Sequence, residues 1–374
     1  MEHTNILDYK RLELKKVDSI NEDITALLEK TVQGSEGGMR WTIHNISEKA
    51  GAYGDSLYFL ALYKKSSLMG VVGLCRRKIL NCGREYDSTY LRYLAIQSAF
   101  QTAGTPGGRG QRLSQVEEGF KHNLLSMFRG PGHNPEHDHS QPESPHIMYA
   151  YIESKNERSK NLINQAGYEY IRSFLTVAFS RFSPRSDRSV ALLAPESQPE
   201  MSRLLAGQYA DYCFYTDEFS FYRNRYYVKR KGNEIIAGVC AIPAEYRVVN
   251  IPGVWGWMIM KVLPATPFFR RLFNPGKFRY LVLGAIYCRK GYEDHLPDLL
   301  EAVCAEEGYH TALTWLDDHS ELYETLRTNR RMGMLNRMLN AKPGLVYSRF
   351  VNLTDQEKNR FYDAPAYVSG FDFS

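Results

Sequence analysis

The feature that most constrains the fold of this sequence is a weak repeat of one strand-rich pattern in its two halves. Two strand-like runs, at 57–63 and 68–76, are joined by a Lys-Lys-Ser-Ser turn, which is typical of a β-hairpin. The runs at 225–230 and 234–242, joined by Lys-Gly-Asn, have the same form. We interpret the chain as two diverged copies of one unit, with a chance likeness between short hairpins as the alternative.

Each copy continues with strand-like runs and helical patterns in the same order, so both halves combine strands with helices. The strand candidates that follow the first hairpin are 90–97, 147–153 and 170–181. The polar, proline-containing segment 183–189 separates the copies. We therefore expect an N-terminal domain of residues 1–184 and a C-terminal domain of residues 190–374, a division that suits a chain of 374 residues.

Composition argues against several classes of protein and partner. The net charge of +5, without long runs of like charge, does not indicate a nucleic-acid partner. No apolar run reaches the roughly 18 residues of a membrane span, and the run 254–263 is interrupted by Lys261. The first residues have no apolar signal-like core, and the six cysteines form no CxxC pair, which predicts reduced thiols and no zinc cage. We expect a cytoplasmic monomer without nucleic-acid or membrane partners.

A glycine-rich turn between a strand and a helix is the first candidate binding element. The turn 101–112 contains Gly108, Arg109, Gly110 and Arg112, and a helical pattern follows it. The first N–H groups of a helix lack partners and lie at the positive end of its dipole, so they bind phosphate groups well. A plain strand-to-helix turn is the alternative at this point.

A second segment, 149–168, and the glycine-rich turn together match the sequence pattern of a known family. Together they resemble the GCN5-related N-acetyltransferase (GNAT) superfamily, in which a Gln/Arg-x-x-Gly-x-Gly/Ala turn receives the CoA pyrophosphate. Residues 105–110, Thr-Pro-Gly-Gly-Arg-Gly, fit this turn except at its first position, and Leu113 follows as in the family's helix. Asn156 and Tyr168 fit the next motif. The resemblance covers the first half well and the second in outline, so the chain looks like a tandem-GNAT protein.

The resemblance implies an α+β fold of two acyl-CoA N-acyltransferase-like domains in tandem. Each would have a central mixed sheet flanked by helices, with two neighbouring strands that splay apart. In the first half these strands are 90–97 and 147–153, and the pantetheine arm of the cofactor would lie between them. Acetyl-CoA, or another acyl-CoA, would be the co-substrate, a small-molecule or peptide amine the acceptor, and no metal is expected. The expected cofactor-binding residues are Leu94, Ala95, Ile96, Gly108, Arg109, Gly110, Gln111, Arg112, Asn156 and Asn161.

Direct attack of a neutral amine on a thioester requires a group that takes up the amine proton. Glu153 and Tyr90 are the candidate catalytic residues, with Asp87 as an alternative base. The purely structural alternative for Glu153 is a solvated carboxylate at the end of a strand. For Tyr90 it is a ring packed on the sheet. Many family members have a tyrosine that protonates the CoA thiolate where this sequence has Ile163. A non-catalytic acyl-CoA-binding protein on the same fold is therefore the alternative function.

Three further segments bear on the site. The turn 288–294 of the second half has one glycine followed by Glu293 and Asp294, whose charge would repel a pyrophosphate, so we expect no CoA site there. The histidine-rich loop 130–145 is proline-rich and polar, which favours an exposed loop over a metal site. The aromatic tail 361–374 is expected to dock on the body of the protein.

Overall fold

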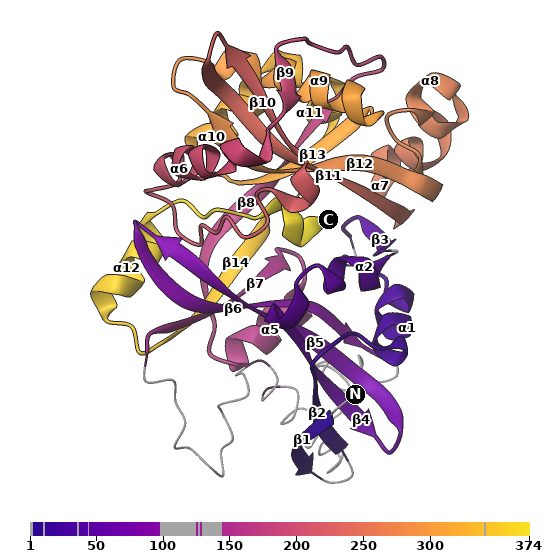
Figure 1. Cartoon of the computed structure of the whole chain (residues 1–374). Coiled ribbons are helices and arrows are strands. Elements are labelled where there is room, and N and C mark those ends of the chain that lie inside the picture. Colours follow the sequence, from indigo (N-terminus) through magenta and orange to yellow (C-terminus); the bar gives the residue numbers. More distant parts are fainter. Residues whose placement is uncertain are drawn as a thin grey trace.

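The computed structural model describes residues 3–9, 12–35, 37–43, 45–97, 125, 128, 144–339 and 342–374. Within these residues the chain forms one continuous mixed sheet of fourteen strands with helices packed on its faces (Figure 1). The α+β class predicted from the sequence is confirmed. All six cysteines are free.

The strands are β1 His3–Tyr9, β2 Leu12–Val17, β3 Arg40–Ile43, β4 Leu57–Lys64, β5 Ser67–Asn81, β6 Arg84–Ile96, β7 His146–Glu153, β8 Glu169–Ser180, β9 Val190–Leu192, β10 Tyr226–Lys231, β11 Glu234–Asn250, β12 Phe278–Cys288, β13 Thr311–Asp317 and β14 Gly344–Val351. Both predicted hairpins form, because β4 pairs with β5 and β10 with β11 in antiparallel register. Lys65 and Gly232 adopt positive φ in the two turns, as tight hairpin turns require.

The order of the strands places the two halves of the chain next to each other in one sheet. First-half strands β1, β2 and β4 to β7 lie at one end, and second-half strands β9 to β13 lie at the other. Between them, β14 pairs with β7, β8 pairs with β13, and β14 and β8 pair with each other. Each half thus contributes a strand to the sheet of the other, and a division into domains 1–184 and 190–374 stays a prediction.

The α-helices are α1 Glu22–Lys30, α2 Ile46–Gly51, α5 Glu157–Gln165, α6 Gln198–Gln208, α7 Gly253–Trp257, α8 Pro267–Arg270, α9 Leu296–Glu307, α10 Glu321–Thr328, α11 Met334–Met338 and α12 Asp355–Asp363. Their ends follow local sequence signals. Asn21, Asn156 and Ser320 each accept a backbone hydrogen bond at a helix N-terminus, and α9 ends at Gly308 in the left-handed conformation.

Three apolar clusters hold the elements together. A large central cluster joins both halves and includes side chains from α1, α6, α12 and the C-terminal tail. A second cluster packs α5 against the first-half strands, and a third packs α9 and α10 against the second-half strands. Among the described residues, no helix combines the length and the apolar character that crossing a bilayer requires.

Candidate active site

The sheet opens between β6 and β7, the strands that sequence analysis expects to splay apart. They pair in parallel only from Asp87 opposite His146 to Leu91 opposite Ala150. Beyond this point β6 continues along β5, while β7 continues along β14. Within the described part of the chain, the edge of β6 from Tyr93 to Ala95 therefore has no strand partner on the side of β7.

A β-bulge shapes β6 where the opening begins. Tyr93 has a φ of 54°, and the register with β5 shifts between the pairs Gly73–Arg92 and Val71–Ala95. Two residues of β6 thus oppose one residue of β5, which bends the strand and re-aims its edge. A positive φ at a tyrosine is strained, and such strain concentrates at functional sites.

Both candidate catalytic residues lie on the same face of the sheet. Side chains alternate along a strand, so Glu153 points to the same side as Tyr149 and Tyr151. Glu153 is half-buried, and its Oε2 accepts hydrogen bonds from the backbone N–H and the hydroxyl of Ser35, both at 2.8 Å. The carboxylate therefore fixes the loop between α1 and β3 over the end of β7.

Tyr90 is enclosed by other rings on that face. Its ring centroid lies 5.2 Å from that of Tyr149 and 5.0 Å from that of Tyr151, and the guanidinium of Arg77 lies over it at 4.5 Å. Tyr90 is 4% exposed, and burial raises the pKa of its hydroxyl well above the usual range. The phenol therefore stays protonated, and in catalysis it would act as a hydrogen-bond donor and not as a base.

The expected cofactor-binding residues of β6 line the opening from both faces. Leu94 and Ile96 pack with the cluster that contains α5, whereas Ala95 faces the central cluster. The turn residues Gly108, Arg109, Gly110, Gln111 and Arg112 lie outside the described residues, so their role remains a sequence prediction.

Helix α5 presents the remaining predicted positions. The side chain of Asn156 accepts the N–H of Ser159 at 3.1 Å and caps the helix, while Asn161 is exposed. Ile163 is buried in the cluster with Leu94, which gives the side chain at this position a packing role. The nearby hydroxyl of Tyr168 donates to the carbonyl of Phe128 at 2.8 Å, so its proton is already engaged.

The second half contains an equivalent opening between β12 and β13. These strands pair in parallel at Leu281–Ala312 and Val282–Leu313 and then separate. Ala285 has a φ of 47°, and the register with β11 shifts there as it does at Tyr93. The repeat inferred from the hairpins therefore extends to the bulge and to the separation of the parallel strands.

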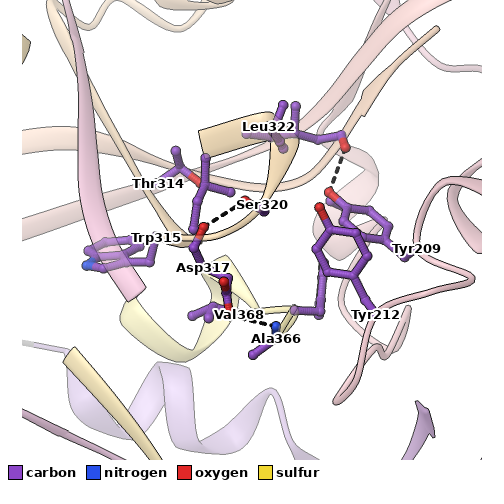
Figure 2. A pocket seen from close by; sticks show the side chains of 14 residues that line it. Tyr209, Tyr212, Thr314, Trp315, Asp317, Ser320, Leu322, Ala366 and Val368 are labelled. Carbon is purple, nitrogen blue, oxygen red and sulfur yellow. Dashed lines mark hydrogen bonds between the residues drawn. The ribbon is translucent and has the colours of Figure 1, made fainter. Parts of the chain in front are cut away.

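The C-terminal tail occupies this second opening. The N–H of Ala366 donates to Oδ2 of Asp317 at 2.8 Å (Figure 2). The N–H of Tyr367 donates to the carbonyl of Cys213 at 2.8 Å. The space that remains between β12, β13 and the tail has a volume of about 10 Å³, enough for about one water molecule. The tail therefore occupies most of the space in this opening.

The end of the tail crosses to the first opening and forms a polar cluster that sequence analysis missed. Asp372 contacts Nη2 of Arg77 at 3.0 Å and the hydroxyl of Tyr53 at 2.9 Å. Arg92 donates to the same hydroxyl and to the backbone carbonyl of Asp372. The aromatic composition of the tail indicated docking, but no local signal pairs Asp372 with Arg77.

No resident metal site emerges in the described residues. Residues 130–143 of the histidine-rich loop lie outside them, whereas His146 bonds Thr89 within the sheet. Asp317, Asp318 and His319 bring possible ligand atoms close together, but both oxygens of Asp317 already accept hydrogen bonds, including two from Arg172. This group therefore fastens the tail to β13.

Comparison with known proteins identifies the fold. No protein-family model and no curated protein sequence matches the chain. N-myristoyltransferase of Saccharomyces cerevisiae with bound myristoyl-CoA matches in structure over 98% of this chain and 91% of its own, with a TM-score of 0.54 and 9% identity. A second structure of that yeast protein, with myristoyl-CoA and inhibitors, covers 97% of this chain and 87% of its own, with a TM-score of 0.52 and 9% identity. A GCN5-related N-acetyltransferase from Anabaena variabilis covers 91% and 73%, at a TM-score of 0.46 and 11% identity.

The one mixed sheet with two strand openings thus defines a fold of two GNAT-like halves, as sequence analysis expects. The particular protein whose fold this chain shares over nearly its whole length is N-myristoyltransferase. Acyltransferases are built on this fold. At 9% identity the likeness shows the fold alone, so activity and substrate must be argued from the site.

Proposed function

We propose that this protein is an acyl-CoA-dependent N-acyltransferase with one acyl-CoA site, at the β6–β7 opening. The observation that carries the proposal is the difference between the two openings. Both have a bulge and separating parallel strands. At the second opening the tail runs along β12 and bonds to the end of β13, whereas at the first opening only its last residues reach Arg77 and Tyr53. The free edge of β6 at Leu94 and Ala95 offers backbone groups to the amide groups of a pantetheine arm.

The chemistry of the proposed reaction is a direct transfer. The amine nitrogen bonds to the thioester carbon, the carbon–sulfur bond breaks, and CoA leaves as a thiolate. Glu153 takes the amine proton, directly or through a water molecule. A backbone N–H of the β6 edge stabilises the oxyanion. The thiolate receives its proton from water, because Ile163 has no proton to donate and the hydroxyl of Tyr168 is held by Phe128.

The identity of the acyl group must be decided by comparing several acyl-CoA molecules. The resemblance to N-acetyltransferases favours acetyl-CoA, whereas the yeast protein with the same fold binds myristoyl-CoA. We propose acetyl-CoA as the first candidate and a longer acyl-CoA as the second. Calorimetry with acetyl-, octanoyl- and myristoyl-CoA ranks the chain lengths by their dissociation constants.

Acyl-CoA binding is tested by placing negative charge in the turn that is predicted to bind the pyrophosphate. A Gly108→Glu, Gly110→Glu variant should lose acyl-CoA binding, because two carboxylates repel the pyrophosphate. A Gly51→Glu, Gly207→Glu variant is the matched control, since a Cβ at either position meets nothing within 4 Å. Unchanged binding by the first variant, or equal loss in both, contradicts the proposed location of the site.

Catalysis is tested by thiol release from acyl-CoA with an amine panel of spermidine, glycinamide and a short peptide with a free N-terminus. Release that depends on one of these amines supports the transferase. Tyr90→Phe should lower kcat at unchanged unfolding temperature if its hydroxyl contacts the reacting atoms. Tight acyl-CoA binding without amine-dependent release favours the alternative, a non-catalytic acyl-CoA-binding protein, which the isoleucine at 163 also fits.

A further inference from the structure

One connection differs sharply between the two otherwise similar halves. In the first half, β5 and β6 are joined by Cys82 and Gly83 alone. In the second half, β11 and β12 are joined by residues 251–277, which form α7, α8 and irregular helical turns. Because the first half folds with a two-residue turn, the fold itself does not require the longer connection.

This connection, which we call the 251–277 insertion, exposes large apolar side chains. Val254 is 84% exposed, Trp257 61% and Phe268 51%. Helices α7 and α8 lie at one side of their half, beside β12 (Figure 1). Val254 and Trp257 are three residues apart on α7, the spacing of one helix face, while the ring of Phe268 on α8 stacks on Phe182 with centroids 3.8 Å apart. Exposed apolar side chains on such a segment indicate an interaction site.

The charged residues along this stretch of the sequence all have one sign. From residue 246 to residue 279 the sequence contains six basic residues and neither Asp nor Glu. They are Arg247, Lys261, Arg270, Arg271, Lys277 and Arg279. Lys277 contacts Glu245 at 3.6 Å, whereas Lys261, Arg270 and Arg271 are exposed and form no ion pair within the described part of the chain.

We propose that the 251–277 insertion is a docking element for the surface of an anionic phospholipid membrane. Trp257, Val254 and Phe268 would enter the boundary between headgroups and acyl chains, and the lysine and arginines would contact the phosphates. A tryptophan with aliphatic groups, followed by exposed cations that form no ion pair, fits this boundary, because tryptophan, lysine and arginine are the side chains that anchor segments there. The protein would lie on the membrane and not cross it, which revises the expectation that it has no membrane partner.

The test is flotation of the full-length protein with vesicles. At low salt the protein should float with vesicles of phosphatidylcholine that contain 30% phosphatidylglycerol. A much smaller fraction of the protein should float with vesicles of pure phosphatidylcholine. The double variant Arg270→Gln, Arg271→Gln should weaken vesicle binding about 30-fold at low salt, because each basic residue near an anionic surface contributes about 1 kcal/mol. Trp257→Ser with Val254→Ser should weaken binding at every salt concentration. All four positions are exposed, so thermal unfolding should change little.

Arg203→Gln with Arg327→Gln is the charge-matched control, since both residues are exposed and lie on α6 and α10, away from the insertion in Figure 1. It should bind vesicles like the wild type. Equal loss in this control shows attraction by net charge and overturns the proposal, as does a wild type that floats with neither vesicle. A dimer in light scattering that dissociates in the Trp257→Ser variant, without vesicle binding, assigns the surface to a second copy and also overturns it.

Discussion

Arg77 on β5 and Asp372 in the tail form an ion pair, with Nη2 of the arginine 3.0 and 3.1 Å from the two carboxylate oxygens. Their side chains are 1% and 0% exposed. The pair joins residues far apart in sequence and holds the end of the tail against the tyrosines of the first opening. It therefore couples the fold of the first half to the segment that fills the opening of the second.

Breaking this pair should strongly destabilise the protein. Arg77→Met leaves the carboxylate of Asp372 buried without its cation and should lower the free energy of unfolding by about 3 kcal/mol or more. Urea unfolding measures the change. The control is Arg289→Met, whose partner Glu234 is exposed, and it should cost less than about 1 kcal/mol. Similar losses in the two variants would show that the buried pair contributes no more than a surface pair.

The tail also fits closely against the second opening. A Cβ on Gly370 would lie 2.6 Å from the carbonyl oxygen of Leu283 and 3.0 Å from Cα of Gly284, both backbone atoms. Gly370→Ala should therefore destabilise the protein by about 2 kcal/mol, the usual cost of overpacking. Gly207→Ala, in open space on α6, should be neutral or slightly stabilising. Equal melting temperatures for wild type and Gly370→Ala would mean that the tail does not pack in the opening in solution.

Glu153 is expected to act on the amine and not on the acyl-CoA. Glu153→Gln should lower kcat about 100-fold, the usual contribution of a general base, while the acyl-CoA dissociation constant stays within about twofold. Steady-state kinetics and calorimetry measure the two quantities. Glu157→Gln, at an exposed position on α5, should leave both unchanged. An unchanged kcat in Glu153→Gln would leave this carboxylate only the structural role of holding Ser35.

Asp187, between β8 and β9, makes stability depend on pH. Hydrogen bonds from Lys229 and then from Ser189 lower its pKa from 3.8 to about 2. A folded-state pKa below the unfolded one means that the stabilisation is present above about pH 4 and disappears as pH falls through 2. Asp187→Asn should cost about 1 kcal/mol at pH 7, after allowance for the one-third exposure of the side chain, and only a small part of that at pH 2, where the folded-state carboxyl is half protonated. A cost that does not change with pH would contradict this assignment.

Local sequence signals predict much of this fold. The hairpins and the strands of the first opening depend on neighbouring residues, and the structure confirms them. The position of β14 between β7 and β8 does not follow from any local pattern, because it depends on pairing between residues almost 200 positions apart. The sequence therefore indicates two copies but not that they exchange strands.

The site is predictable to a smaller extent. The family pattern around Asn156 points to the β6–β7 opening, and alternation along β7 places Glu153 on the face of Tyr149. The cluster of Arg77, Asp372, Tyr53 and Arg92 could not be foreseen, since charge and aromatic content do not reveal which residues a tail will contact. The acidic turn after Cys288 leads us to expect no CoA site in the second half. The tail in the β12–β13 opening gives a second, structural reason for that expectation.

Hydrogen exchange with and without acyl-CoA tests the central claim most directly, because it reports on both openings in one experiment. A single site at the β6–β7 opening predicts slower exchange at residues 93–97 on binding, with no change at residues 284–288. Protection at the β12–β13 opening, or at both openings with two molecules bound per chain, would contradict the account.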